Sequence, residues 1–404
     1  IAVADINHDG LDDLYVGSSK WQKSRVFLQQ PSGKFLEKPQ PTLWADSTYE
    51  EVDAQWADLN GDGHLDLMVA TGGNEFTGNA PWLRPRLYLN DGSGSLRAAE
   101  RAFPESLRLT AACVVLLDAN GDGHLDIFLG ARAIPWGYGR KADSFLLLND
   151  GKGQFTDVTA QLAPELRQLG MVKAALWEDF GQGPELVVAL EWDGIVAFGK
   201  DSNGSFRKRL LTTRRGWWNM LYAMDLDGDG DLDLLVGNLG LNRRYKASVE
   251  QPVRMYVHDY DDNGRAEQLL TYYVQGQETL FADKREIERQ LPYIKKKYVY
   301  SRDFGKASLV DIFGKNTLEK AIVWEADFFE NATLTNTGKG DFVLRALPTA
   351  LQYAPYMAAH RVGMTAQEGV VMVGNNYDVN IQRDRYDASY GMWVRPNPTT
   401  GLLE

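Results

Sequence analysis

Short apolar runs separated by turn residues dominate the chain. Four of them, Leu14–Gly17, Leu67–Ala70, Ile127–Gly130 and Leu234–Gly237, have the length and side-chain types of buried β-strands. A second pattern consists of a strand, a glycine-containing turn and then Phe or Leu, which predicts a β-hairpin. Seven such hairpins are expected, starting near Arg25, Arg86, Phe145, Val196, Val253, Ala332 and Met392.

These two patterns alternate, so each repeat is predicted to contain a strand, a loop, a second strand, a connection and a hairpin. Repeats of four antiparallel strands cannot bury a core alone, and they close on themselves in β-propellers. The fold predicted is therefore all-β: a single seven-bladed β-propeller of four-stranded antiparallel blades spanning residues 1–404. An open solenoid is the competing interpretation.

One segment breaks the strand rhythm, at about residues 277–320. It contains Asp283-Lys-Arg-Glu286, a capping-box pattern that predicts a helix continuing to Gln290. A basic triplet, Lys295–Lys297, follows and is expected to lie on a solvated helix face. We expect a helical insertion here, placed before the sixth blade.

Acidic residues gather in five loops that fit the pattern D-x-[DN]-x-[DN]-G-x-x-[DE]. Positions 1, 3 and 5 place oxygen side chains around one centre, the glycine permits a sharp turn, and the carbonyl of position 7 and the carboxylate of position 9 can complete a hard-cation site. The candidate metal ligands are Asp5, Asn7, Asp9, Leu11 and Asp13; Asp58, Asn60, Asp62, His64 and Asp66; Asp118, Asn120, Asp122, His124 and Asp126; Asp225, Asp227, Asp229, Asp231 and Asp233; and Asp259, Asp261, Asn263, Arg265 and Glu267.

These loops are not EF-hands. Position 12 of the first four is an aliphatic residue where an EF-hand needs Glu, and strands rather than helices follow each loop. Hairpin turns without metal are the alternative, because Asp, Asn and Gly also favour turns. Five such loops recur in register, and the carboxylates within each loop would repel one another without a counter-ion. All-oxygen ligands favour Ca²⁺ over Mg²⁺, so about five calcium sites are predicted.

The acidic loops and the Leu-x-Val-Gly runs after them resemble the FG-GAP/VCBS repeat family, whose propellers include the integrin α-subunit head. A closer similarity is to bacterial VCBS-repeat proteins of the cartilage-acidic-protein-like group, and it depends on Gly216–Asn219, Val236–Asn242, Leu270–Tyr273 and Arg385–Gly391. The resemblance implies an exported protein, often longer than this chain. It also implies acidic loops in blades four and seven. In blade four the loop after Trp177 is two residues shorter and has lost its central Asn and Asp, and the blade-seven segment lacks the carboxylates.

Propeller topology predicts which face binds a partner. All five acidic loops, that of Asp259 included, are expected to line one rim, and the long connections open on the opposite face. Aromatic and Arg residues are enriched at binding surfaces, although any one of them can simply pack its loop onto the scaffold. The candidate partner-binding residues are Trp82, Arg84, Trp136, Tyr138, Arg140, Arg243, Arg244, Tyr245, Tyr377, Arg383, Arg385 and Tyr386.

Composition narrows the class of protein. Lys and Arg number 43 against 55 Asp and Glu, a formal charge of −12, which argues against a nucleic-acid partner. The sequence contains no run of 18 apolar residues that predicts a transmembrane segment. Cys113 is the only cysteine, so an internal disulfide cannot form. Because the chain starts at Ile1 inside a strand-like run, we expect a piece of a longer exported chain.

Catalytic motifs are missing: the sequence has no G-x-S-x-G, H-E-x-x-H or P-loop, and three of its five His residues lie in acidic loops. The function predicted is a non-catalytic, calcium-stabilised binding or adhesion module, extracellular or in the cell envelope, whose partner is a protein or a glycan. Two alternatives remain. One is a structural subunit of an outer-membrane or surface assembly with an envelope-complex partner, and the other is a calcium-dependent polysaccharide lyase.

Overall fold

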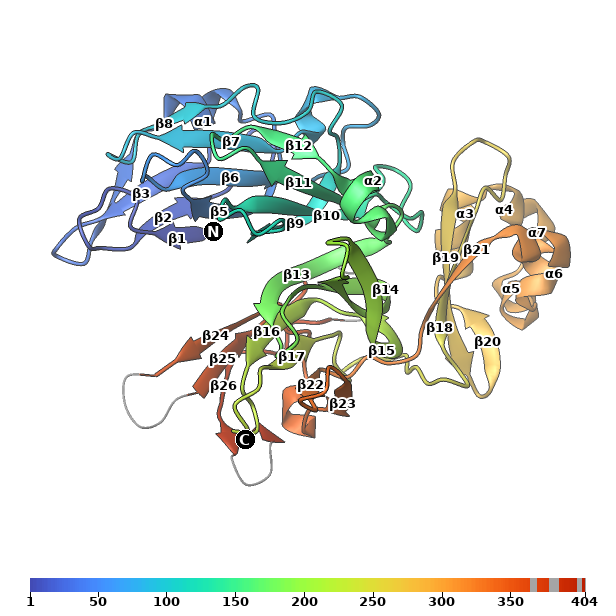
Figure 1. The fold of residues 1–404 in the computed structure, drawn as a ribbon. Helices are drawn as coiled ribbons and strands as arrows, with labels where there is room; N and C mark the ends of the chain where they lie inside the picture. The colour runs from blue at the N-terminus through green and yellow to red at the C-terminus, as the bar shows by residue number, and fades with distance from the viewer. Residues whose placement is uncertain (364–368, 378–384, 398–401, 404) are drawn as a thin grey trace.

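The computed structural model describes residues 1–363, 369–377, 385–397 and 402–403 (Figure 1). Antiparallel sheets built in chain order dominate it, and the first three have four strands each. Their strands are β1 (Ala2–Ala4), β2 (Asp13–Val16), β3 (Arg25–Gln29) and β4 (Phe35–Lys38); β5 (Glu51–Ala57), β6 (Asp66–Thr71), β7 (Arg86–Asn90) and β8 (Leu96–Ala98); and β9 (Thr110–Leu117), β10 (Asp126–Ala133), β11 (Phe145–Asn149) and β12 (Phe155–Asp157).

The fourth sheet consists of β13 (Met171–Asp179), β14 (Pro184–Lys200) and β15 (Phe206–Trp217). Strand β14 turns back on itself. A β-carbon on Gly199 would lie 2.8 Å from Glu185 Oε1, whereas a straight strand would place these residues about 45 Å apart. Trp192, between them, has a left-handed φ of 69°. The two halves of β14 therefore act as separate strands, and this sheet follows the four-strand repeat.

The fifth sheet joins distant parts of the chain, because β17 pairs with β22 through Leu234 and Leu334. The sixth has three strands, and a short two-stranded pair follows it. The strands of the fifth sheet, the sixth sheet and the pair are β16 (Met220–Met224), β17 (Asp233–Gly237), β22 (Ala332–Asn336) and β23 (Phe342–Ala346); β24 (Ala358–Val362), β25 (Gly369–Val373) and β26 (Met392–Val394); and β27 (Pro396–Asn397) and β28 (Leu402–Leu403).

The core lies between consecutive sheets. The first strands β1, β5, β9, β13, β16 and β24 pack each against the next, and each interface has its own apolar cluster. Tyr15 of the first sheet and Val69 of the second share one such cluster, and Val187 of the fourth and Val236 of the fifth share another. Sheets covered on both faces need continuous apolar strands, which is why every residue of β6 is buried.

Short helices fill the connections between and within these sheets. They are α1 (Pro41–Ala45), η1 (Pro81–Leu83), α2 (Thr159–Leu162), η2 (Pro164–Leu166) and η3 (Thr349–Leu351). The predicted antiparallel four-stranded sheets are thus confirmed. Six sheets form the series, and in the described part of the chain no strand joins the sixth sheet to the first.

Residues 238–331 form an insertion between β17 and β22, drawn in yellow to orange in Figure 1. The main-chain N–H of Asn238 donates to Asn331 Oδ1 at 2.8 Å and closes the base of the insertion. Its sheet has the order β20-β19-β18-β21. Its elements are β18 (Val253–His258), β19 (Glu267–Val274), β20 (Gln277–Leu280), α3 (Lys284–Gln290), α4 (Tyr293–Lys297), α5 (Ser301–Lys306), α6 (Leu309–Phe313), α7 (Lys315–Lys320) and β21 (Ile322–Ala326).

The capping box predicted for this region is confirmed: Asp283 Oδ1 accepts from the N–H of Glu286, and the Glu286 side chain accepts from the N–H of Asp283. The insertion is nevertheless larger than the predicted 277–320 and has its own sheet. The hairpin starting at Val253 belongs to it, and the hairpin starting at Ala332 completes the fifth sheet. The assignment of these two hairpins to the fifth and sixth repeats was therefore wrong, because β17 pairs across the insertion.

Candidate functional site

The acidic loops are organised by hydrogen bonds to their own backbone. Asp5 Oδ1 accepts from the N–H of Asp9 at 3.1 Å, and Asp5 Oδ2 accepts from the N–H of Gly10 at 2.8 Å. Asn7 Oδ1 accepts from the same Asp9 N–H at 3.1 Å. The loops beginning at Asp58 and Asp118 repeat these contacts. The loop backbone thus holds these carboxylates in position.

The carboxylate at the ninth position of the first four acidic loops also binds the third strand of its sheet. Asp66 is buried, and it accepts hydrogen bonds from the N–H of Leu59 at 3.2 Å and from the N–H of Asn90 at 3.0 Å. Burial raises its pKa to about 6, and the charges of Asp62 and Asp58 add to the shift. The same two-sided contact recurs at the equivalent residues, Asp13, Asp126 and Asp233. These carboxylates therefore fasten each loop to the third strand of its own sheet.

Asparagine side chains at the ends of three third strands connect neighbouring sheets. Asn90 Nδ2 donates to the carbonyl of Ile6 at 2.8 Å, in the loop of the preceding sheet. Asn149 makes the same bond to Leu59 at 2.9 Å, and Asn336 makes it to Phe180 at 3.0 Å. This role was not predicted from the sequence, although the signal is there: each Asn is followed two residues later by Gly.

Two acidic groups bring three carboxylates close enough together to hold one metal ion. One ligand oxygen from each of Asp225, Asp227 and Asp229 lies within 4.8 Å of the others, and the same holds for Asp259, Asp261 and Glu267. In the second group Asp261 Oδ1 is buried and has no hydrogen-bond partner among the described residues. An unpaired buried carboxylate oxygen among like charges fits a hard cation.

The acidic loops of the first sheets lie side by side, since His8 Nε2 is 3.2 Å from His64 Nδ1. The Asp259 loop lies elsewhere. Its Arg265 guanidinium is 4.8 Å from the ring centre of Trp136, on the β10–β11 connection at the end of the sheet opposite the Asp118 loop. The expectation that all five loops share one rim was wrong for the Asp259 loop, because the insertion folds back over the long connections.

The largest cavity described, about 820 Å³, opens where the insertion meets these connections. Its walls come from the start of β5, the loop after β6, the start of β9, the β10–β11 connection, the Asp259 loop and α3. They include Glu50, Glu75, Arg132, Trp136, Tyr138, Arg265, Glu267, Gln268 and Gln290. Two predicted partner-binding residues, Trp136 and Tyr138, thus share a site with two predicted metal-loop residues, Arg265 and Glu267.

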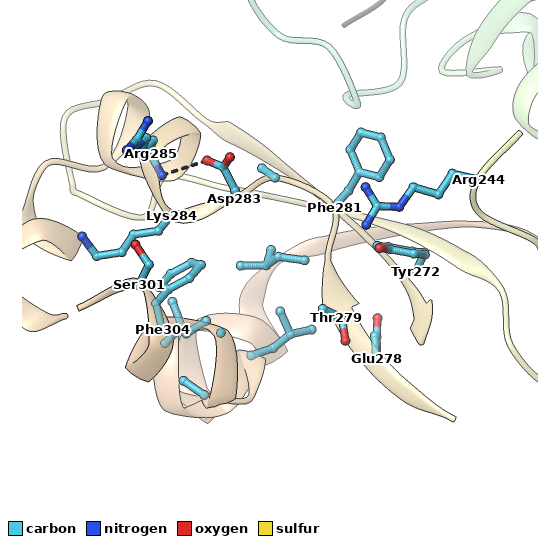
Figure 2. A pocket seen from close by; sticks show the side chains of 16 residues that line it. Arg244, Tyr272, Glu278, Thr279, Phe281, Asp283, Lys284, Arg285, Ser301 and Phe304 are labelled. Atoms are coloured by element: carbon cyan, nitrogen blue, oxygen red, sulfur yellow. Dashed lines mark hydrogen bonds between the residues drawn. The ribbon is translucent and has the colours of Figure 1, made fainter. Parts of the chain in front are cut away.

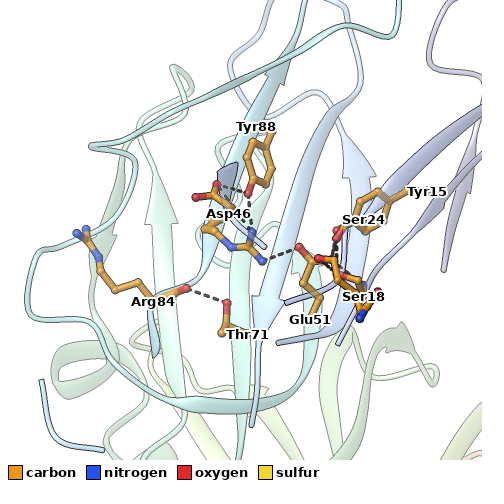
Figure 3. A network of polar contacts seen from close by, with 10 residues as sticks. Tyr15, Ser18, Ser24, Asp46, Glu51, Thr71, Arg84 and Tyr88 are labelled. Carbon is orange, nitrogen blue, oxygen red and sulfur yellow. Dashed lines mark hydrogen bonds and ion pairs between the residues drawn. The ribbon is translucent and has the colours of Figure 1, made fainter. Parts of the chain in front are cut away.

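The wall next to Glu50 is held by a buried ion pair (Figure 3). Arg86 Nη2 lies 2.7 Å from Glu51 Oε1. The other oxygen of Glu51 accepts from Tyr15 Oη at 2.5 Å, from the N–H of Ser18 at 3.0 Å and from Ser24 Oγ. Burial raises the pKa of Tyr15 far above its usual range, and the Glu51 charge adds to it, so this phenol stays protonated and donates. The network joins the first sheet to the second.

Most of the other predicted partner-binding residues pack onto the scaffold or pair locally. Tyr245 and Tyr386 are buried, with their hydroxyl oxygens 2.9 Å apart, and Trp82 stacks on Phe76. The remaining positions are Arg84, which donates to the Phe103 carbonyl; Arg243, which lies over Phe329; Arg385, paired with Asp387; the exposed Arg140 and Tyr377; and Arg383, which lies outside the described residues.

Arg244 lines a second cavity, of about 430 Å³, inside the insertion. Figure 2 shows Arg244 and Tyr272 on one side and Asp283, Lys284 and Arg285 on the other. Several charges here already have partners: Lys284 pairs with Glu288, and Glu278 accepts from Arg254 at 2.9 Å. Its charged groups are therefore largely used within the insertion.

Two overlapping stretches, residues 5–69 and 58–129, match the family model of the FG-GAP-like repeat. The chain is an FG-GAP repeat-containing protein. The resemblance predicted from the acidic loops is thereby confirmed, and the matched FG-GAP repeats contain the loops of Asp5, Asp58 and Asp118. Within the described residues, no helix of this FG-GAP protein combines the length and apolarity needed to cross a membrane.

Three solved structures are distantly similar to this FG-GAP protein. An ancestral GH74 enzyme is 10% identical with a TM-score of 0.35, over 91% of this chain and 48% of the enzyme, so the chain spans about half of that protein's length. A putative exo-β-1,3-galactanase from Bifidobacterium bifidum is 9% identical with a TM-score of 0.33, over 70% and 90%. A mutant Aleuria aurantia lectin in complex with α-methyl-L-fucoside is 10% identical with a TM-score of 0.29, over 83% and 94%.

Proposed function

We propose that this FG-GAP repeat protein is a non-catalytic, calcium-stabilised binding module of an exported protein, and that it presents its long connections to a protein or glycan partner. The observation that carries the proposal is the cavity of about 820 Å³ among those connections. Concave sites lined by an aromatic side chain and a few converging polar groups are the usual form of a ligand site. We call this side of the molecule the loop face.

The proposed fold is a β-propeller in which each sheet of the series is one blade. The contacts of each first strand with the next, and the apolar clusters between the sheets, support this arrangement. A seven-bladed ring would need one sheet beyond these six, since the sheet of the insertion is not part of the series.

The proposed calcium role is structural. Residues Asp259, Asp261 and Glu267 would hold one ion and Asp225, Asp227 and Asp229 another, and the three loops with Asn at position 3 offer the same oxygen donors. A bound cation would neutralise the like charges that gather in each loop. In the six sheets of the series, metal and partner would then bind at opposite ends. The ion would stabilise the acidic loops at one end (the acidic rim), and the long connections at the other end would bind the partner.

The test compares two exposed cations on opposite faces. Arg140→Glu changes the loop face, and Lys152→Glu changes the β11–β12 turn on the acidic rim. Binding of both variants to a panel of oligosaccharides and to immobilised envelope proteins would be measured in calcium buffer. We expect Arg140→Glu to weaken binding and Lys152→Glu to leave it unchanged.

The opposite ranking would place the binding surface on the acidic rim and overturn the proposal. Incubation of the wild type with acidic polysaccharides tests the lyase alternative. Unsaturated products, detected by their ultraviolet absorbance, would show that the protein is an enzyme and would likewise overturn it.

A further inference from the structure

We infer that the loop-face cavity binds a neutral saccharide, with the Trp136 ring as its stacking platform and the converging carboxyl groups of Glu50 and Glu75 as hydrogen-bond acceptors for its hydroxyl groups. This inference rests on the proposed binding function and names its ligand class and site. Three features of the cavity support it: a fixed aromatic ring, a carboxyl pair over a glycine, and a guanidinium on the facing wall.

The Trp136 side chain is held in one orientation while much of it remains exposed. Its indole N–H donates to the carbonyl of Asn74 at 2.6 Å, and its main-chain N–H donates to Asn74 Oδ1 at 2.7 Å. The residue is nevertheless 54% exposed. An exposed ring that is already immobilised loses little conformational entropy when a ligand stacks on it. A sugar ring presents an apolar C–H face to such a surface and its hydroxyl groups to the walls.

Glu50 and Glu75 converge over Gly73 at one end of the cavity. A β-carbon on Gly73 would lie 2.8 Å from Glu50 Oε2 and 3.0 Å from Glu75 Oε2, so both carboxyl groups lie close to this residue, whose φ of 90° favours glycine. Burial raises the pKa of Glu50, and the neighbouring Glu75 charge and hydrogen bond add to the shift. Two carboxyl groups this close can share a proton and still offer several acceptor sites.

The facing wall, which belongs to the insertion, supplies the Arg265 guanidinium. This group lies over one face of the Trp136 ring, 4.8 Å from its centre, so the saccharide would stack on the opposite face of the indole. Gln268 Nε2 donates to the Tyr138 carbonyl at 3.2 Å, and Trp324 Nε1 donates to the Gly139 carbonyl at 2.7 Å. These bonds fix the insertion on the β10–β11 connection and so hold Arg265 beside Trp136.

The charges favour a neutral saccharide over an anionic one. Arg132 lines the cavity, but its guanidinium already pairs with Glu191 at 2.7 Å. Glu50 and Glu75 therefore face the cavity against Arg265, since Arg132 is paired and Glu267 belongs to the proposed calcium site. A uronic acid or sulfated sugar would meet like charges here, which is unfavourable in a partly desolvated site.

The experiment measures binding of the full chain to neutral oligosaccharides and to uronic-acid oligosaccharides in calcium buffer, by glycan array and then by calorimetry. We expect neutral sugars to bind and uronic-acid sugars not to. Trp136→Ala should weaken the affinity about 30-fold or more, since aromatic anchors dominate such contacts. Glu75→Gln should weaken it about tenfold through loss of a charged acceptor.

Matched controls are available on the same chain. Trp21 is 73% exposed, has a left-handed φ of 65° and lies 4.4 Å from Lys20 Nζ, much as Trp136 lies beside Arg265. Trp21→Ala and the exposed Glu100→Gln should leave saccharide affinity unchanged. If uronic-acid sugars bind instead, or if Trp136→Ala and Trp21→Ala behave alike, the inference is wrong. If Arg140→Glu weakens binding of a protein while no sugar binds, the inference fails and the proposed function stands.

Discussion

The side-chain amide of Asn149 donates to the carbonyl of Leu59 at 2.9 Å and so joins the third sheet to the acidic loop of the second. The same Nδ2 also donates to the Leu125 carbonyl, and Asn149 Oδ1 accepts from the N–H groups of Gly151 and Gly153. One buried side chain therefore satisfies four backbone groups in three different loops.

Asn149→Ala should lower the free energy of unfolding by about 2 to 4 kcal/mol, because it leaves buried backbone groups without partners. Urea denaturation followed by circular dichroism would measure this change. Asn203→Ala, at an exposed turn, is the control and should change the free energy by no more than about 0.5 kcal/mol. Equal effects of the two substitutions would show that the Asn149 side chain does not stabilise the contact between the second and third sheets.

Calcium should raise the melting temperature, and chelation with EDTA should lower it. Each site filled at a hundred times its dissociation constant adds about 2.7 kcal/mol to the free energy of unfolding. Mg²⁺ should stabilise less at equal concentration, since it tolerates irregular ligand geometry poorly. An identical melting curve with EDTA and with calcium would rule out the metal sites.

Two substitutions separate metal binding from loop folding. Asp122→Ala should remove part of the calcium-dependent rise in melting temperature, because it deletes one oxygen ligand. Asp179 lies in the shorter loop between β13 and β14, where its Oδ1 accepts from the N–H groups of Gly181 and Gly183. Asp179→Ala should lower the melting temperature equally with and without calcium. A loss of the calcium response in Asp179→Ala would instead assign metal to that loop.

Glu51→Ala should destabilise the protein by about 3 to 5 kcal/mol, because Arg86 would remain as a buried charge without its partner. Replacing both residues with apolar ones should cost less than the two single changes together. The exposed pair of Arg25 and Glu37, 3.6 Å apart, is the control, and Glu37→Ala should cost at most about 1 kcal/mol. Urea denaturation of the two single variants, the double variant and the control measures each change in the free energy of unfolding.

Stability should depend on pH through Asp53. Its Oδ2 accepts from the N–H of Val114 at 2.9 Å, and burial, the largest cause, raises its pKa above the usual range. The folded state therefore keeps this proton to a higher pH than the unfolded state. The stability that Asp53 contributes is greatest at low pH and is lost as pH rises through the folded pKa.

Asparagine has no titratable carboxyl group, so Asp53→Asn removes this contribution to the pH dependence of stability. The stability of the wild type relative to the variant should fall as the pH rises above the ordinary aspartate range and through the raised pKa of folded Asp53. Urea curves at several pH values in EDTA would measure the difference, since chelation removes the metal contribution. A difference that stays constant with pH would contradict the prediction.

Local chemistry made much of the fold predictable. The hairpins starting at Arg86 and Phe145 follow from their apolar runs and glycine turns, and Asp283 caps α3 as its spacing indicates. Strand pairing over long distances was not predictable in this way. The hairpins at Val253 and Ala332 look alike in sequence, yet only the second pairs with β17. Asn336, placed like Asn90 and Asn149 before a glycine turn, was the signal that distinguished them.

The candidate site was predictable only in part. The ligands of each acidic loop lie within nine residues, so their pattern is visible in sequence. The cavity is assembled from distant segments, and no local pattern brings Glu50 near Arg265. Aromatic residues in loops were also ambiguous: Trp136 lines the cavity, whereas Tyr245 and Tyr386 pack against each other inside the insertion interface.

The contact between Asn238 and Asn331 at the base of the insertion has a consequence for biosynthesis. The ribosome makes β17 well before β22, so the outer edge of β17 has unpaired backbone groups while residues 238–331 are synthesised. Open strand edges are where nascent chains associate wrongly. Folding of the insertion brings Asn238 and Asn331 together and shortens the loop that must close before β22 can pair. The rate at which the insertion folds therefore sets how long the growing chain is exposed to aggregation.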